Sequence, residues 1–202
     1  MKRLRILRNT AFTLIEMMVS IGIGMVVVAA VTTTFMSQTK IYNAQEQINE
    51  MEQNARAALD VITRELKMAG YKPNNGPVYG LGALGVNFDN TKLVIEADLN
   101  ADNSIDGSAG SLERISYAYN SSSKRITRRL GSGSSDVLAD NITDFNFTYL
   151  KADGTTATLA SQIRQVRIDI TAKTAAPDPY TANGGYRTYQ VSATITPPNL
   201  GY

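Results

Sequence analysis

Hydrophobic residues near the start of the chain form one long uninterrupted stretch. From Phe12 to Met36 the sequence is apolar around the whole circumference of a helix and carries a single formal charge, Glu16. At about 1.5 Å per residue, this stretch is long enough to cross a hydrocarbon core of about 30 Å. A buried core helix is the alternative, but such helices are usually shorter and amphipathic. We therefore predict a membrane-spanning helix over 12–36.

Beyond this span the pattern becomes amphipathic, because apolar residues recur at intervals of three, four or seven positions. The predicted stripe consists of Ile41, Ile48, Met51, Ala55, Leu59, Ile62, Leu66 and Ala69. No proline interrupts residues 12–69, and Gly70 is placed to end the helix as a left-handed cap. We expect one continuous helix whose second half, 37–70, needs a domain to cover its stripe; a plain coiled coil is the competing interpretation.

The rest of the chain, 71–202, shows the alternation of β-strands. Residues 71–90 contain two prolines and four glycines and are expected to form an irregular connection. Strand patterns follow at 91–97, 112–119, 124–130, 142–150, 163–171 and 186–196. One face of several strands is apolar and the other polar, which predicts an antiparallel sheet with a single buried side. The expected fold class is therefore α+β, with a long N-terminal helix packed on the sheet of a globular head.

Charge is distributed unevenly along the 202 residues, although the formal net charge is only +2. The first eleven positions carry four basic residues and no acidic one, so the rest of the chain has 16 basic and 18 acidic residues and a net charge of −2. By the positive-inside rule, the basic leader 1–11 places the N-terminus in the cytoplasm and the head outside. The mildly acidic body makes nucleic acid an unexpected partner.

Composition removes most catalytic groups. The chain contains no cysteine and no histidine, which excludes a thiol nucleophile, an imidazole base and a zinc site of thiolate and imidazole ligands. Serine, carboxylate and lysine chemistry stay open, but no arrangement of these residues supports a catalytic site. We therefore do not expect an enzyme.

Glu16 stands out because a carboxylate inside a bilayer costs about 2.5–3.5 kcal/mol on insertion scales. It can reach the headgroup layer, since it lies near the start of the span. Cleavage before Phe12 offers a second explanation, because the new α-amino group would lie one helical turn from Glu16 on the same face.

The segment from Arg8 to Glu16, RNTAFTLIE, resembles the processing signal of type IV prepilins and type II secretion pseudopilins. These proteins have a short basic leader, a small residue at the cut, a following Phe and a Glu fifth in the mature chain. The small residue is normally Gly, whereas this chain has Ala11. The resemblance implies that a prepilin peptidase cuts between Ala11 and Phe12 and methylates the Phe12 amine. It also implies that Glu16 pairs with the terminal amine of a neighbouring subunit.

The head resembles PilW-type minor pilins, through LERISY at 112–117, ITR at 126–128 and NITDFNFTYL at 141–150. This resemblance implies a minor pilin, inserted in the inner membrane and then incorporated with other pilins into a filament. A minor pseudopilin of a type II secretion system shares every N-terminal feature. A membrane-anchored extracytoplasmic binding module is the alternative from another class.

The stretch from Asp98 to Gly107 is the main candidate for site chemistry. Oxygen-bearing residues alternate as in calcium loops of the D-x-[DN]-x-[DN] type, in which they converge on a hard cation. Ala109 occupies the place of the usual bidentate carboxylate, for which Glu113 is a candidate substitute. The alternative is an Asx-rich connection whose side chains bond their own backbone. The candidate calcium ligands are Asp98, Asn100, Asp102, Ser104 through its carbonyl, and Asp106.

A second cluster is basic and consists of Lys124, Arg125, Arg128 and Arg129. In a strand, Lys124 and Arg128 share one face while Arg125 and Arg129 share the other. The cluster therefore need not form one patch, and we interpret it as a solvated strand edge and not as a nucleic-acid site.

Overall fold

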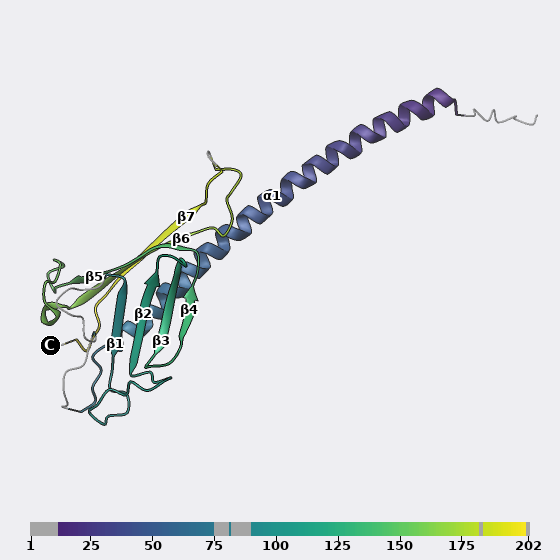
Figure 1. Ribbon diagram of the computed structural model, residues 1–202. Helices are drawn as coiled ribbons and strands as arrows, with labels where there is room; N and C mark the ends of the chain where they lie inside the picture. Colours follow the sequence, from purple (N-terminus) through teal and green to yellow (C-terminus); the bar gives the residue numbers. More distant parts are fainter. Residues whose placement is uncertain (1–11, 75–80, 82–89, 182–183, 201–202) are drawn as a thin grey trace, which may run out of the picture. The chain divides into compact units, whose positions relative to one another are not determined.

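The computed structural model describes residues 12–74, 81, 90–181 and 184–200. The predicted leader 1–11, including Ala11, and most of the connection expected over 71–90 lie outside the described residues. The chain divides into two compact units, Met1–Gln45 and Glu46–Tyr202. One helix, α1 (Leu14–Leu66), contributes residues to both units (Figure 1).

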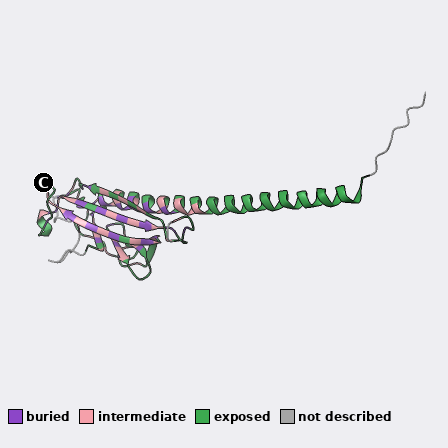
Figure 2. Ribbon diagram, turned by 90° about the horizontal axis from the view of Figure 1, so that it is seen from above, coloured by how far each residue is buried: buried purple, intermediate pink, exposed green. Residues whose placement is uncertain are grey.

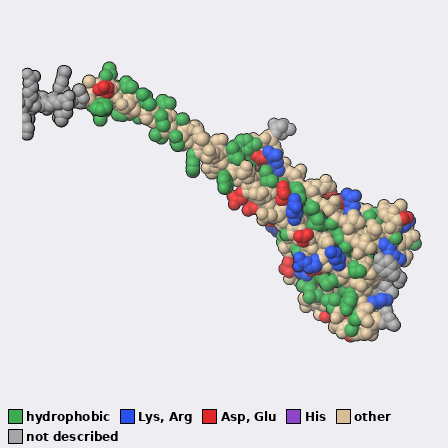
Figure 3. Space-filling model, turned by 180° about the vertical axis from the view of Figure 1, so that it is seen from behind, with side chains coloured by type: hydrophobic (Ala, Val, Ile, Leu, Met, Phe, Trp, Pro, Cys, Tyr) green, Lys and Arg blue, Asp and Glu red, His purple; other side chains and the backbone are tan. Residues whose placement is uncertain are grey.

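The part of α1 in the first unit is apolar and exposed. An 18-residue window of the helix has a mean hydropathy of 2.4 and contains no buried residue, and α1 is the one helix among the described residues that is long and apolar enough to cross a membrane. Figure 3 shows its hydrophobic side chains on the surface. The hydroxyls of Ser20, Thr32 and Thr34 donate to carbonyls four residues earlier, at 2.7–2.9 Å. These polar groups are thus satisfied within the helix, as a bilayer requires.

The part of α1 in the second unit buries the predicted stripe (Figure 2). Ile48 is partly buried, but Ile41 is 42% exposed and does not belong to the core. The helix ends at Leu66 and not at Ala69, and the next turn reaches Gly70, whose φ of 76° is the expected left-handed cap. The buried helix residues are Met51, Ala55, Ala58, Leu59, Ile62 and Leu66.

The strands form two antiparallel sheets, where the sequence predicted one. The first has the order β1-β2-β3-β4, and the second has the order β5-β6-β7. The break falls at Asn141, whose φ of 54° turns the chain between β4 and β5. The bounds are β1 (Lys92–Glu96), β2 (Arg114–Asn120), β3 (Arg125–Leu130), β4 (Ser135–Ala139), β5 (Ile142–Leu150), β6 (Gln165–Lys173) and β7 (Thr188–Ile195), with a short 3-10 helix at Ala160–Gln162.

A single core joins both sheets to α1. Its largest fully buried side chains are Tyr117, Phe145 and Phe147, accompanied by isoleucines and leucines from the helix and the strands. The rings of Phe145 and Phe147 meet edge to face, with centroids 4.7 Å apart. Among the described residues, every buried side chain lies at or after Met51. The second unit therefore contains the complete described core.

Candidate functional site

The start of α1 is built around a hydrogen-bonded pair of side chains, Thr13 and Glu16. The Oε2 atom of Glu16 accepts hydrogen bonds from the Thr13 backbone N–H at 2.9 Å and from the Thr13 hydroxyl at 2.8 Å. In return, the Glu16 N–H donates to the Thr13 hydroxyl at 3.3 Å. This is a capping box, which satisfies N–H groups that a helix start leaves without partners. The T-x-x-E spacing is the sequence pattern of a capping box, but Thr13 was not among the predicted functional residues.

Phe12 lies before the helix and its side chain is 80% exposed. The expected cut between Ala11 and Phe12 therefore precedes the first helical residue, Leu14, although Ala11 itself is outside the described residues. Phe12 and Glu16 are predicted to lie one helical turn apart once the chain is cleaved. In the uncleaved chain the helix starts at Leu14 and Glu16 bonds to Thr13, so the arrangement after cleavage stays a prediction.

The Asp98–Asp106 segment is held together by its own backbone N–H groups. The two carboxylate oxygens of buried Asp98 accept from the N–H of Ala101 at 2.8 Å and of Asn103 at 3.0 Å. Ala101 and Asn103 both adopt the left-handed conformation, with φ of 66° and 63°. Shorter turns follow, and in the first of them the side-chain oxygen of Asn100 accepts a hydrogen bond from the Asp102 N–H.

Glu113 fastens this segment from outside it. Its Oε1 accepts from the N–H groups of Leu99 and Asn100, both at 3.1 Å, and its Oε2 accepts from the Asp106 N–H at 2.8 Å. Glu113 is only 5% exposed, and its carboxylate, the candidate substitute metal ligand, closes the loop through these three hydrogen bonds.

The hydrogen bonds in this loop follow the Asx-turn alternative. Backbone and side-chain donors of Ser104 lower the pKa of Asp102, and those of Ser108 lower the pKa of Asp106. Among the described residues, no group of three or more acidic side chains is placed to hold a metal ion. Calcium binding by Asp98, Asn100, Asp102, Ser104 and Asp106 stays a prediction.

Comparisons with known proteins bear on both ends of the chain. The profile of the family "prepilin peptidase-dependent protein B" matches residues 44–196. The chain belongs to this family. The prokaryotic N-terminal methylation motif matches residues 6–32, which include Ala11, Phe12 and Glu16. A type IV-like pilin from Thermus thermophilus aligns at a TM-score of 0.44 and 13% sequence identity, over 74% of this chain and 98% of that chain. A comparison with curated proteins gives no match.

The family match confirms the predicted resemblance to the type IV prepilin superfamily. The α+β fold, with a long N-terminal helix packed on antiparallel strands, is likewise confirmed. The narrower resemblance to PilW-type minor pilins stays a prediction, as does the assembly role of Glu16.

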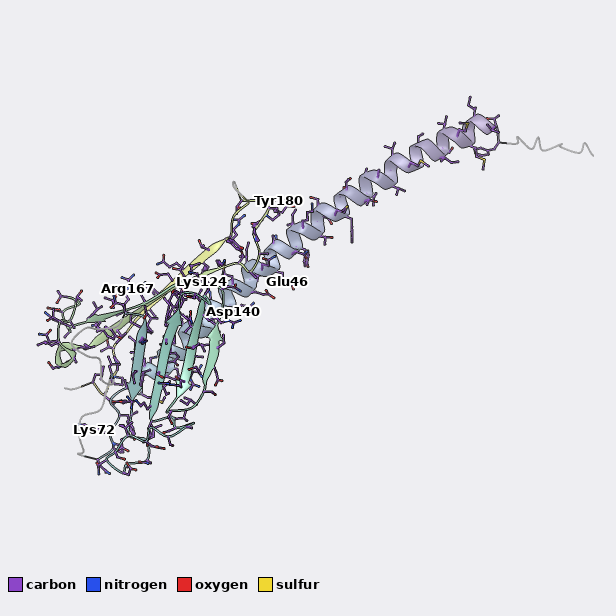
Figure 4. The ribbon with its side chains drawn as sticks, viewed as in Figure 1. Glu46, Lys72, Lys124, Asp140, Arg167 and Tyr180 are labelled. Atoms are coloured by element: carbon purple, nitrogen blue, oxygen red, sulfur yellow. The ribbon has the colours of Figure 1, made fainter. Side chains whose placement is uncertain are left out.

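The basic cluster of this prepilin peptidase-dependent protein does not behave as one solvated edge. Arg128 forms an ion pair with Glu65 of α1, with 2.5 Å between Arg128 Nη2 and Glu65 Oε1. Tyr117 of β2 donates its hydroxyl to the same carboxylate. Lys124 occupies the β2–β3 turn with a φ of 55° (Figure 4). The prediction that Arg128 and Arg129 lie on opposite faces of the strand is correct. The sequence pattern did not indicate that Glu65 is the partner of Arg128.

The head also contains a cavity of about 250 Å³, formed by α1 and the strand connections near Asp140 and Lys173. The side-chain amide of Asn54 donates to the carbonyl and to the carboxylate of Asp140, at 3.2 and 3.1 Å. Glu50 and Gln47 line the same cavity. Its carboxylates and amides form no combination of nucleophile and base, and we assign it no chemistry.

Proposed function

We propose that this chain is a minor pilin, a subunit that is inserted in the inner membrane, processed by prepilin peptidase and incorporated into a type IV pilus. The observation that carries the proposal is the methylation motif at the start of an exposed apolar helix, on a chain of a prepilin peptidase-dependent family. An exposed 18-residue stretch of helix with a mean hydropathy of 2.4 needs lipid or other apolar helices around it. The bilayer fills this need before assembly, and the helices of other pilins fill it afterwards.

Processing at Ala11–Phe12 fits the local structure. Phe12 and Thr13 are not helical, so the proposed cut precedes the first helical residue, Leu14. The new α-amino group of Phe12 carries a positive charge next to the positive end of the helix dipole, which is unfavourable. A carboxylate nearby offsets this charge. In the proposed filament, the Glu16 carboxylate of one subunit offsets the amine of another.

The deciding measurement is the mature N-terminus of the chain, determined by mass spectrometry from native membranes. We expect the chain to begin at N-methylated Phe12, and an intact Met1 or a cut elsewhere contradicts the proposal. A Glu16→Ala variant is expected to insert normally and to enter filaments poorly, whereas an exposed-face control, Ser37→Ala, is expected to assemble normally.

A minor pseudopilin is the second candidate, because the methylation motif is shared with type II secretion. Deleting the chain and counting surface pili, while measuring secreted protein in the same cultures, separates the two. Loss of pili with normal secretion supports the pilus proposal. Loss of secretion with normal pili supports the pseudopilin.

A further inference from the structure

Strand β7 is the last strand of the three-stranded sheet and leaves one side of that sheet open. It pairs with β6 over its full length, Thr188–Ile195, without a register shift. Among the described residues, none forms a hydrogen bond with the backbone along the other side of β7. The outer edge of this eight-residue strand therefore presents backbone groups that have no partner among the described residues.

The register identifies which groups face outward. The Thr174 N–H donates to the Arg187 carbonyl at 2.9 Å, just before β7 begins. In an antiparallel pair, residues that bond to the partner alternate with residues whose N–H and C=O face away. Because the register runs on without a shift, the outward backbone groups belong to Thr188, Gln190, Ser192 and Thr194, all of which are exposed.

The other sheet edges carry features that discourage pairing, and β7 has none of them. Strand β1 is short, has charged ends at Lys92 and Glu96, and pairs further with Leu81. Strand β4 is equally short, contains Asp136, and pairs with β3 across a register shift. Charges, bulges and covering segments are the usual means by which proteins block edge-to-edge pairing.

Strand β5 is protected as well, since its edge is interrupted and partly covered. Its pairing with β6 shifts between Ile142 and Asp144, and its Phe147 N–H donates to the Asn90 carbonyl at 2.8 Å. By contrast, β7 reads TYQVSATI, with no charge, no proline and no bulge. Its outward side chains are hydroxyls and an amide.

We propose that the outer edge of β7 binds an extended edge strand of a neighbouring pilin subunit, so that the three-stranded sheet continues across the subunit boundary. This inference rests on the proposed function, which surrounds the head with other pilin heads. A strand supplies the alternating donors and acceptors that the edge lacks, as in other cases of strand addition. The partner strand has uncharged side chains facing β7, because nothing along Thr188–Ile195 offers a charge to pair.

The two ends of β7 set the length of the added strand. Before β7, the Arg187 guanidinium is bonded to the Asp178 carboxylate at 2.6 Å, which fixes the turn. After β7, Pro197 and Pro198 provide no backbone donors. The outward backbone donors that continue from β7 therefore end at Thr196.

Site-specific photo-crosslinking in filament-producing cells tests the contact. A photoreactive phenylalanine analogue replaces Ser192 at the edge or, as the matched control, Arg167 on the central strand β6 (Figure 4). Arg167 is exposed and lies opposite Thr194 on the same face of the sheet. We expect an adduct with another pilin subunit from position 192, mapped by mass spectrometry to a strand, and none from position 167. Equal adducts from both positions, no adduct from 192, or an adduct to a helix overturns the proposal.

A backbone variant supplies a second readout. Ser192→Pro removes an outward N–H and none of the bonds to β6, which is the setting in which an edge strand tolerates proline. With the photoreactive group at Gln190, we expect Ser192→Pro to abolish the adduct and Ser192→Thr to preserve it. An adduct that survives the proline overturns strand pairing.

N-methylation at Phe12 and incorporation into filaments are measured in the same cells. A chain with the photoreactive group at position 192 that is processed and incorporated, but gives no adduct, overturns the strand contact and leaves the proposed function standing. A wild-type chain that never enters filaments overturns both.

Discussion

Glu65 is the residue whose replacement tests the helix–sheet contact most directly. Its carboxylate accepts from Arg128 Nη2 at 2.5 Å and Nε at 3.1 Å, and from the Tyr117 hydroxyl. Tyr117 is completely buried, while the Arg128 and Glu65 side chains are 23% and 13% exposed. Glu65→Ala removes the partner of all three donors at once.

The expected cost follows from what each donor loses. A buried hydroxyl without a partner costs about 1–3 kcal/mol. Breaking a fully buried ion pair costs about 3–5 kcal/mol, but Arg128 reaches solvent and loses less than this. We therefore expect the free energy of unfolding to fall by about 2–4 kcal/mol. For a unit of this size, 1 kcal/mol shifts the melting temperature by about 2–4 °C, so the expected fall is about 4–16 °C.

Thermal and urea unfolding of a fragment beginning at residue 37 measures this change, because the described core lies entirely at or after Met51. Asp60→Ala, at an exposed position of the same helix, is the matched control and is expected to change stability little. Replacing both charges, as Glu65→Leu with Arg128→Leu, is expected to recover the part of the loss that comes from the unpaired Arg128 guanidinium, but not the part that comes from the Tyr117 hydroxyl. A cost below about 1 kcal/mol for Glu65→Ala would refute the reasoning, since one unpaired buried hydroxyl already accounts for that much.

Three further predictions concern the pH dependence, the loop and the helix start. Burial, reinforced by Glu65, raises the pKa of the Tyr117 hydroxyl above its usual value near 10. The unfolded chain therefore loses this proton at a lower pH than the folded chain, and the free energy of unfolding falls as the pH rises above about 10. Tyr117→Phe should reduce that fall, measured by unfolding curves at alkaline pH. The calcium hypothesis predicts that millimolar calcium raises the melting temperature of the head and that Asp102→Asn removes the rise, while no rise at all eliminates the hypothesis. Thr13→Ala should weaken the start of α1 by about 0.5–2 kcal/mol, seen as faster amide exchange at Leu14 to Met17 in detergent micelles, whereas Thr13→Ser should preserve protection.

Much of the fold could be predicted because periodicity reports burial. The stripe from Met51 to Leu66 is buried as expected, and the inward residues of β2, β5 and β6 follow the predicted alternation. In these segments one face contacts the core and the other contacts water. The residue type at each position therefore indicates whether that position is buried or exposed. Ile41 has the same spacing, but it is exposed and lies outside the core.

The missed elements lack that contrast. Strand β4 is five residues long and exposes its first three, so its sequence, SDVLA, shows no alternation. The two sheets separate between β4 and β5, where Asn141 adopts a left-handed conformation in a turn that composition alone does not distinguish from a hairpin. Neither feature leaves a periodic signal.

The candidate loop shows a different limit of sequence reasoning. Alternating Asp and Asn side chains suit both a cation and backbone N–H groups, because both are positive partners of the same oxygens. The conformation of the loop depends also on Glu113, which is buried and accepts hydrogen bonds from three N–H groups of the loop, although it lies outside the loop in sequence. Only the fold brings Glu113 to that place.

Glu16 and Glu65 are carboxylates of one helix whose partners differ in kind. Glu16 bonds to Thr13, three positions away, and nothing in the core depends on that pair. Glu65 bonds to residues 52 and 63 positions away and joins the helix to a sheet. A local pair can be exchanged for another partner without disturbing the packing, whereas a long-range pair cannot. We therefore expect Glu16 variants to impair assembly while the head keeps its melting temperature, and Glu65 variants to lower that temperature first.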